Sequence, residues 1–309
     1  MKIAALILSV LCDAFVFRFL LRLAAGKSVI ALAVESFLYI TGYRNRFSKR
    51  KGFETYFAQR RSANEKPVSL PEKRRSRAPL TAESFGGMQV YVFNRGKGDK
   101  RAFYLHGGAY LNRPQKMHLR FLAGLAKNTG AEIVVPLYPL LPGHGGAEVF
   151  SLIRTLYLSY AADGKETVLM GDSSGGGLAA AIALSGIPAP SRIILLSPWV
   201  DVSMKNPGLN EYDRDPLCAL YGLKRLGALW AKDCGVDDPR VSPVNGDLSG
   251  LARVTVFAGE RELLYPDIRR FCDGVPGCES IVGKNLHHDW PLYPIPEAKR
   301  ARKEILNKF

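Results

Sequence analysis

The sequence lacks the features that would point to metal sites, disulfide frameworks or secretion. Its five cysteines contain no Cys-x-x-Cys pair and no spacing typical of metal ligands, which argues against a zinc site. No Asn-x-Ser/Thr sequon occurs in the chain. A chain of 309 residues can bury a core large enough to fold without such staples. We therefore expect free thiols and a cytoplasmic protein.

Long hydrophobic runs are also missing. Ile3–Leu11 is a continuous small and apolar run, but Asp13 and Arg18 follow soon after it. This stretch is far shorter than the roughly 20 residues that span a bilayer, and no Ala-x-Ala cleavage site follows it. The pattern of Ile3–Leu23 instead indicates an amphipathic helix. Such a helix would lie either on the protein's own core or on a membrane surface.

Acidic residues are scarce in the first quarter of the chain. Residues 1–79 hold 16 Lys or Arg against 5 Asp or Glu, whereas the remaining 230 residues hold 27 against 23. Most of the formal charge of +15 therefore lies in the N-terminal part, chiefly in Arg44–Lys51 and Lys73–Arg77. No zinc-finger, RNP-like or helix-turn-helix pattern accompanies it, so we expect no nucleic-acid partner. Two interpretations stay open: a solvated basic face, or weak peripheral contact with an anionic membrane surface.

Beyond residue 80, apolar runs alternate with helical patterns. Continuously apolar strands separated by helices indicate a mostly parallel sheet covered on both faces. The predicted strands are Gln89–Asn94, Arg101–His106, Glu132–Tyr138, Thr167–Gly171, Arg192–Ser197, Arg253–Gly259 and Glu279–Val282, and the predicted helices are Gln115–Asn128, Ala147–Ala161, Ser174–Ser185, Leu263–Cys272 and Pro296–Asn307. Residues 200–245 interrupt this alternation and are interpreted as an insertion over the strand ends. We thus divide the chain into a basic and apolar segment, residues 1–80, and an α/β domain, residues 81–309.

The strongest local signal is a serine between two glycines, Gly171-Asp-Ser173-Ser-Gly175, placed between a predicted strand and a predicted helix. A G-x-S-x-G pattern in this context makes a sharp turn that exposes the serine hydroxyl as a nucleophile. The alternative is a phosphate-binding glycine loop, but the Lys-Ser/Thr of a P-loop does not follow these glycines. The context therefore favours a nucleophilic serine.

A second signal, His106-Gly107-Gly108-Ala109, follows another predicted strand. Acyl transfer needs N–H donors aimed at the oxyanion that forms on the substrate carbonyl. Consecutive glycines let backbone amides turn inward without obstruction by side chains. A simple Gly-Gly turn is the alternative, but the combination with the serine turn is much more specific.

Together these motifs resemble the α/β-hydrolase fold, specifically the hormone-sensitive-lipase-like family of esterases, over about residues 85–300. The matching pieces are His106–Ala109, Tyr138–Pro142, Gly171–Gly175, Leu196–Asp201, Asp238–Pro243, Ala258–Leu264 and His287–Trp290. The resemblance implies an eight-stranded, mostly parallel sheet with helices on both faces. It also implies a small helical cap, built from the N-terminus and the insertion.

The resemblance implies a catalytic triad in the order serine, acid, histidine. Ser173 is the expected nucleophile. Glu262 stands where the family places its acid, with Glu260 and Asp267 as competing carboxylates. The carboxylate fixes the imidazole tautomer and stabilises the imidazolium that forms during catalysis.

The expected base is His288, because His288-Asp-Trp fits the family pattern of histidine, one residue, then an aromatic. His287 is its adjacent competitor. His106 is expected to shape the oxyanion loop, and His118 and His144, which carry no motif, are expected to be exposed.

The oxyanion motif ends in Ala109 where the family often has a third glycine. By the resemblance, the expected oxyanion donors are the amides of Gly107, Gly108 and Ser174.

These expectations describe a serine carboxylesterase that acts on small-molecule esters with short acyl chains and prefers acetyl to butyryl. No cofactor or metal is implied. Because acyl-transfer chemistry is shared, an amidase, a formamidase or an exopeptidase of the same fold is the alternative. A non-catalytic hydrolase-fold binding protein is the third hypothesis.

Overall fold

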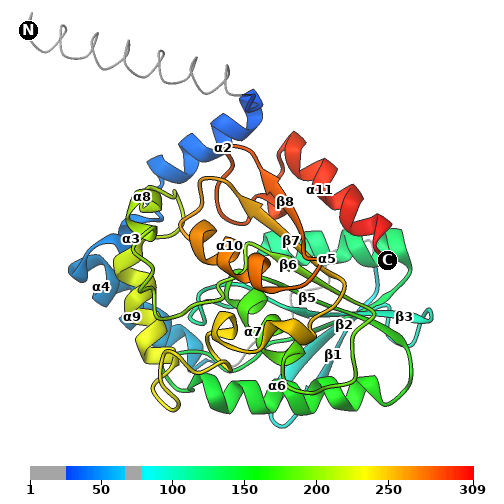
Figure 1. Cartoon of the computed structure of the whole chain (residues 1–309). Coiled ribbons are helices and arrows are strands. Elements are labelled where there is room, and N and C mark those ends of the chain that lie inside the picture. The colour runs from blue at the N-terminus through cyan, green and yellow to red at the C-terminus, as the bar shows by residue number, and fades with distance from the viewer. Residues whose placement is uncertain (1–25, 67–77) are drawn as a thin grey trace, which may run out of the picture.

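The computed structural model describes residues 26–66 and 78–309. They form one α/β unit with a central sheet, helices on both of its faces, and further helices at one edge (Figure 1). The amphipathic helix predicted for Ile3–Leu23 and the whole basic cluster Lys73–Arg77 lie outside the described residues.

The central sheet has eight strands in the order β1-β2-β4-β3-β5-β6-β7-β8. Their bounds are β1 Leu80–Phe85, β2 Met88–Phe93, β3 Lys100–Leu105, β4 Glu132–Pro136, β5 Glu166–Asp172, β6 Arg192–Leu196, β7 Val254–Gly259 and β8 Glu279–Gly283. The β1–β2 and β2–β4 pairs are antiparallel and all others are parallel. The predicted fold class, an eight-stranded and mostly parallel sheet, is confirmed.

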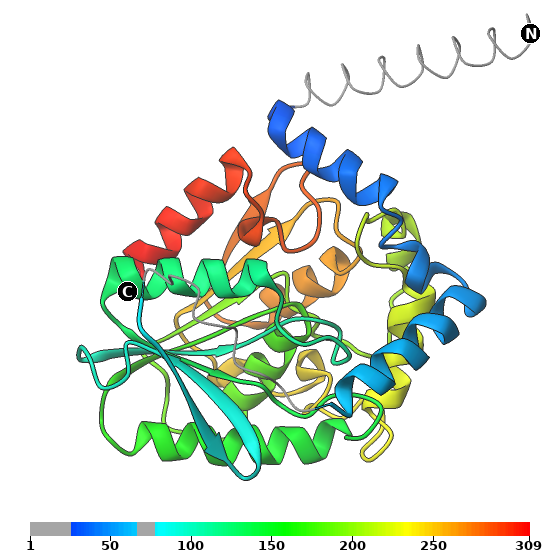
Figure 2. The ribbon, with the colours of Figure 1, turned by 180° about the vertical axis from the view of Figure 1, so that it is seen from behind.

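Two layers of helices cover the sheet (Figures 1 and 2). One layer consists of α5 (Lys116–Thr129) and α11 (Pro296–Asn307), and the other of α6 (Gly146–Ala161), α7 (Ser173–Ala183) and α10 (Tyr265–Gly274). Side chains of a strand alternate between the layers. On β3, Phe103 is buried with the α6 layer and Tyr104 with the α5 layer. This double coverage explains why the parallel strands are continuously apolar.

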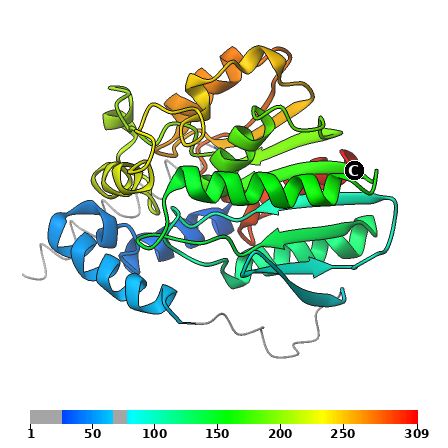
Figure 3. The ribbon, with the colours of Figure 1, turned by 90° about the horizontal axis from the view of Figure 1, so that it is seen from below.

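The remaining helices lie at the edge where the parallel strands end (Figure 3). These edge helices are α2 (Val29–Ile40), α3 (Asn45–Ser48), α4 (Arg50–Asn64), α8 (Leu209–Tyr212) and α9 (Leu220–Trp230). The described residues also form three 3-10 turns, η1 Pro243–Asn245, η2 Leu248–Gly250 and η3 Trp290–Leu292. Helices α3 and α9 pack closely at Gly222, which has no side chain. A Cβ atom at this position would lie only 2.6 Å from the Cβ of Phe47. We propose that the chain is divided into an N-terminal segment, residues 1–80, and a catalytic domain, residues 81–309, with an insertion at residues 200–245.

Across residues 26–66 and 78–309, no helix is both long enough and apolar enough to cross a membrane.

Candidate active site

Ser173 lies at the sharp turn between β5 and α7. Its backbone has φ of +49°, in the left-handed region that serine rarely adopts. A Cβ at Gly171 would lie 2.4 Å from the carbonyl oxygen of Gly175, and one at Gly175 would lie 2.1 Å from that of Leu105. Only glycine fits these two positions, and the resulting turn presents the Ser173 hydroxyl at the end of the strand.

Two hydrogen bonds connect Ser173 to a histidine and a carboxylate. His288 Nε2 lies 2.9 Å from Ser173 Oγ, and His288 Nδ1 lies 3.0 Å from Glu262 Oε2. Glu262 follows β7 and is completely buried, and His288 lies in the loop after β8. In this arrangement Nδ1–H donates to Glu262, which leaves Nε2 to accept the serine proton.

The competing residues point elsewhere. Glu260 Oε2 accepts the backbone N–H of Asn285 at 2.8 Å, and Asp267 on α10 accepts a bond from Asn206 at 2.7 Å. His287 Nδ1 lies 2.8 Å from the carbonyl oxygen of its neighbour His288. The structure thus brings together Ser173, Glu262 and His288, and none of the competitors contacts the serine.

The oxyanion loop requires one correction. The N–H of Gly107 donates to Asp172 Oδ1 at 2.9 Å, so the prediction that Gly107 is an oxyanion donor is wrong. The cavity beside Ser173 is lined instead by Gly108 and Ala109. Ala109 has φ of +55°, which turns the loop so that residues 108 and 109 follow the cavity wall.

Ser174 lies in the first turn of α7, where backbone N–H groups have no partner within the helix. Its Oγ accepts the N–H of Tyr110 at 3.3 Å, so the serine turn and the oxyanion loop are held together. The backbone amides of Gly108, Ala109 and Ser174 are therefore the candidate oxyanion donors. The donation from Gly107 to Asp172 could not be read from the sequence.

Asp172 is a buried anchor that sequence reasoning missed. It accepts hydrogen bonds from Tyr104 Oη at 2.5 Å and from His118 Nε2 at 3.0 Å, in addition to Gly107. Burial alone would raise the pKa of Asp172, but the His118 charge and these hydrogen bonds lower it. His118 is buried, so the prediction that it is exposed is wrong. The only sequence signal was the position of Asp172 inside the serine motif.

His106 is buried, and its ring stacks on Tyr138 with centroids 4.4 Å apart. Burial lowers its pKa to about 4, so the ring is neutral. It has no contact with Ser173, in keeping with the expected role in shaping the loop.

Comparison with known proteins decides the family. The sequence model described as the α/β hydrolase fold matches residues 102–289, which is more than half of the chain and includes the three candidate catalytic residues. The chain belongs to the α/β-hydrolase fold family.

Individual relatives of this hydrolase agree with that assignment. It is similar to an esterase of Acinetobacter venetianus, with 30% identity over 66% of this chain and 72% of the relative. A Mycobacterium tuberculosis protein called a candidate acetyl-hydrolase, LipR, is 36% identical over 65% of this chain and 70% of its own. The crystal structure of a candidate esterase from Staphylococcus aureus has a TM-score of 0.79 at 30% identity, over 86% of this chain and 95% of that one.

The same fold occurs in a hormone-sensitive lipase from a metagenome library. Its structure has a TM-score of 0.74 at 24% identity and covers 90% of this chain and 97% of that one. The predicted resemblance to esterases of the α/β-hydrolase fold is confirmed.

In this hydrolase a cavity of about 150 Å³ lies beside Ser173. Its polar lining comes from Asn112, Gln115, His118 and Asp289, and its apolar lining includes Leu38, Phe47, Met117, Leu217 and Leu223. The cavity is small compared with the roughly 300–1,000 Å³ of pockets for drug-sized ligands. Helices α2 and α9 therefore restrict the space beside the serine.

Asp289 sets the electrostatics of the hydrolase site. Its Oδ2 lies 3.3 Å from His288 Nε2, the atom that also faces Ser173. Burial, together with the charges of Asp172 and Glu262, raises the pKa of Asp289 well above its ordinary value. Burial alone would lower the pKa of His288, but the Asp289 charge and the contacts with Cys218 and Glu262 raise it well above the usual range.

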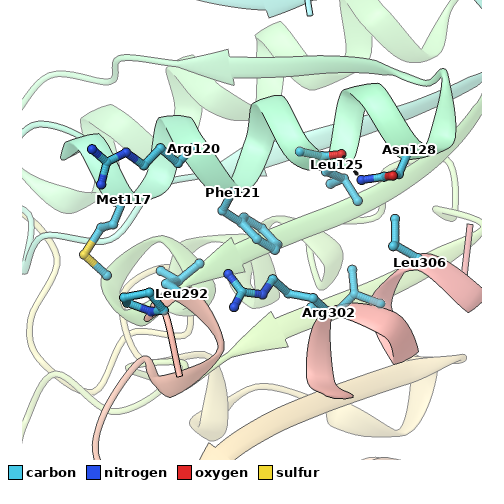
Figure 4. A pocket seen from close by; sticks show the side chains of 11 residues that line it. Met117, Arg120, Phe121, Leu125, Asn128, Leu292, Arg302 and Leu306 are labelled. Carbon is cyan, nitrogen blue, oxygen red and sulfur yellow. Dashed lines mark hydrogen bonds between the residues drawn. The ribbon is translucent and has the colours of Figure 1, made fainter. Parts of the chain in front are cut away.

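A second cavity, of about 230 Å³, lies between α5 and α11 (Figure 4). Phe121 of α5 and Arg302 of α11 face each other across it. Neither Ser173 nor His288 lines this cavity, although Met117 lines both cavities. The second cavity is therefore a neighbour of the candidate active site and holds none of its nucleophilic groups.

Within the described ranges, no group of three or more His, Cys, Asp and Glu side chains is placed to hold a metal ion.

Proposed function

We propose that this protein is a serine carboxylesterase that hydrolyses short-chain acyl esters. Ser173 Oγ attacks the ester carbonyl carbon while His288 Nε2 takes its proton, and Glu262 stabilises the imidazolium. The amides of Gly108, Ala109 and Ser174 donate hydrogen bonds to the oxyanion. His288 then returns the proton to the leaving alcohol, and Ser173 remains acylated.

The second half of the reaction uses the same groups. A water molecule gives its proton to His288 Nε2 and attacks the acyl carbon, and Ser173 leaves with that proton. The products are the carboxylic acid and the alcohol, and no further reactant is needed.

One observation carries this proposal: the unbroken chain of hydrogen bonds from Ser173 Oγ through His288 to Glu262, at 2.9 and 3.0 Å. A buried carboxylate behind the imidazole supplies both the tautomer and the charge stabilisation that a serine hydroxyl needs to become a nucleophile. The esterase names of the relatives support a carboxylic ester as the substrate.

The proposed preference for short acyl chains is supported by the cavity of about 150 Å³. Large apolar residues, Leu217 and Leu223 among them, narrow this space. An acetyl group needs less room than a butyryl group, so acetyl esters should be the better substrates.

The test is hydrolysis by the purified full chain of p-nitrophenyl acetate, p-nitrophenyl butyrate, an acetyl anilide and a formyl amide. We expect the acetate to be hydrolysed fastest, and Ser173→Ala to lower that rate by a factor of about a thousand or more. An unchanged rate in Ser173→Ala would refute the proposal. Faster hydrolysis of either amide than of p-nitrophenyl acetate would show that the protein is an amidase rather than an esterase.

Contact of this enzyme with an anionic membrane surface is also a proposal.

A further inference from the structure

Helix α2 carries an apolar face that nothing in the described part of the chain covers. Of the seven exposed large hydrophobic residues among the described ranges, five lie on this one helix. Ile30, Phe37 and Ile40 are 52%, 64% and 83% exposed. Spaced by seven and three residues, they share one side of a helix. An apolar patch concentrated in this way marks a contact surface.

The opposite side of α2 is fixed to the body of the protein. Ala31, Leu32 and Glu35 are buried. Glu35 pairs with Arg261 at 3.1 Å, and the N-cap residue Ser28 donates from both its backbone N–H and its hydroxyl to the carboxylate of Glu297. The outward direction of Phe37 and Ile40 is therefore set by packing on the inner side.

A row of cations follows directly after this face. Arg46, Lys49 and Lys51 are exposed, and no carboxylate of the described residues forms an ion pair with any of them. Arg46 is held over the ring of Tyr43, with its guanidinium carbon 5.1 Å from the centroid. Along the chain, the apolar stripe is thus followed by exposed cations that have no ion-pair partner among the described residues.

We propose that this face of α2 docks on an anionic lipid bilayer. Ile30, Phe37 and Ile40 enter the boundary between headgroups and acyl chains, and the three cations meet the anionic headgroups. An amphipathic helix lying in the plane of the interface combines these two contributions, and each basic residue near such a surface strengthens the attraction.

A second copy of the chain fits this surface less well. A second copy that met this face through its own α2 would supply no carboxylate to these cations, because the only acidic residue of α2, Glu35, is buried. A bilayer with anionic lipid instead offers apolar and negatively charged groups together.

The geometry of the site gives such docking a use. Leu38, one residue after Phe37, lines the cavity beside Ser173. The same helix therefore borders the proposed acyl site on one side and bears the lipid-binding face on another. Docking would hold the cavity close to esters dissolved in the membrane. The lipid contact itself does not depend on the esterase activity.

The experiment measures binding of the full chain to vesicles by co-sedimentation. Vesicles of phosphatidylcholine mixed with phosphatidylglycerol should bind the protein more tightly than vesicles of phosphatidylcholine alone, and added salt should weaken the binding. Phe37→Ser combined with Ile40→Ser should lower the association constant by about tenfold or more, because two apolar side chains no longer enter the interface.

The charges are tested by Lys49→Glu combined with Lys51→Glu. This variant should lose about tenfold or more in affinity for the mixed vesicles at low salt, and less at high salt. Two matched controls should bind as the parent does. Val282→Ser removes an apolar side chain that is 40% exposed on β8. Lys97→Glu combined with Lys127→Glu makes the same charge change at exposed sites outside the edge helices.

Hydrolysis of water-soluble p-nitrophenyl acetate should stay within about twofold in all these variants, because the substituted side chains are exposed. That measurement separates a folding defect from a binding defect. Three results would overturn the proposal: variants of α2 that bind as the parent does, equal losses in the controls, or a change from dimer to monomer in Phe37→Ser with Ile40→Ser while vesicle binding persists. The last result would assign the face to a second copy.

Discussion

At the scale of single residues, the candidate chemistry depends on Glu262 being ionised beneath His288. Glu262→Gln keeps the size of the side chain but removes the charge that stabilises the imidazolium and offers the wrong hydrogen-bonding group to Nδ1–H. We expect kcat to fall by a factor of about a hundred to ten thousand.

The other two carboxylates serve as controls for this substitution. Glu260→Gln and Asp267→Asn should each retain activity to within about threefold, since neither group contacts His288 and each bonds elsewhere. Kinetics with p-nitrophenyl acetate decide the matter. A larger loss in Asp267→Asn than in Glu262→Gln would give the acid role to Asp267.

The carboxylate of Asp289 is expected to raise the pKa of His288 and so to shift the pH dependence of kcat/KM. Its carboxylate lies beside His288 Nε2, with Asp172, Glu262 and His118 also exerting charge on it. When Asp289 is ionised, its negative charge favours the protonated imidazole. Asp289→Asn should therefore lower the pKa of His288 and move the acid limb of the kcat/KM profile to lower pH.

Asp267→Asn is the matched control for the pH profile. Asp267 is also buried, and burial raises its pKa to about 6, but its partner is Asn206 rather than His288. Its substitution should leave the acid limb in place. A limb that stays fixed or rises in Asp289→Asn would contradict the electrostatic role given to Asp289.

Residue-scale prediction from the sequence reached the groups that a motif marks and missed those that only the fold brings together. Ser173 could be nominated from its glycine-flanked motif, and Glu262 and His288 from the resemblance to the hydrolase family. The engagement of Gly107 by Asp172 could not, because it depends on where the Asp172 side chain points after β5 ends. The burial of His118 depends on the same carboxylate.

At the scale of elements, we expect α9 to limit the length of the acyl chain. Leu223 lines the cavity beside Ser173, whereas Leu226 on the same helix is buried but does not line it. Leu223→Ala should raise the ratio of kcat/KM for butyrate over acetate by about tenfold, since discrimination by one or two methylene groups is of that size.

Leu226→Ala is the control for this prediction. It should destabilise the protein by about 2–5 kcal/mol, as deletion of a buried leucine does, without changing the ratio of the two esters. Steady-state kinetics with both substrates give the answer. A similar change of the butyrate-to-acetate ratio in both variants would show that loosening of α9, rather than the size of the cavity, sets the preference for acetyl esters.

Most central elements could be predicted because buried parallel strands are apolar along their whole length. Seven strands and five helices were expected close to their observed positions. β1 was missed because it is an antiparallel edge strand with several exposed polar residues, so neither alternation nor an apolar run marks it. α3 packs against α9 at Gly222, and α4 packs against α9 through the rings of Phe53 and Tyr221; no local pattern reveals either contact.

At the scale of the whole molecule, the edge helices and the sheet share one core. A single buried cluster contains Phe47 and Phe53 from α3 and α4, Leu226 from α9, and Val90 and Leu195 from the sheet. Elements that share a core unfold together. Urea unfolding followed by tryptophan fluorescence and by far-ultraviolet circular dichroism should give one coincident transition. A fluorescence transition at lower urea concentration would show that the edge helices unfold as an independent unit.

The central claim is that Ser173 is a nucleophile activated by His288. The most direct test is covalent labelling of the full chain by a fluorophosphonate, followed by mass spectrometry of the peptides. We expect one adduct, on Ser173, with labelling abolished in Ser173→Ala and slowed by a factor of about a hundred or more in His288→Ala. Labelling of another residue, or equal labelling of the parent and Ser173→Ala, would contradict it.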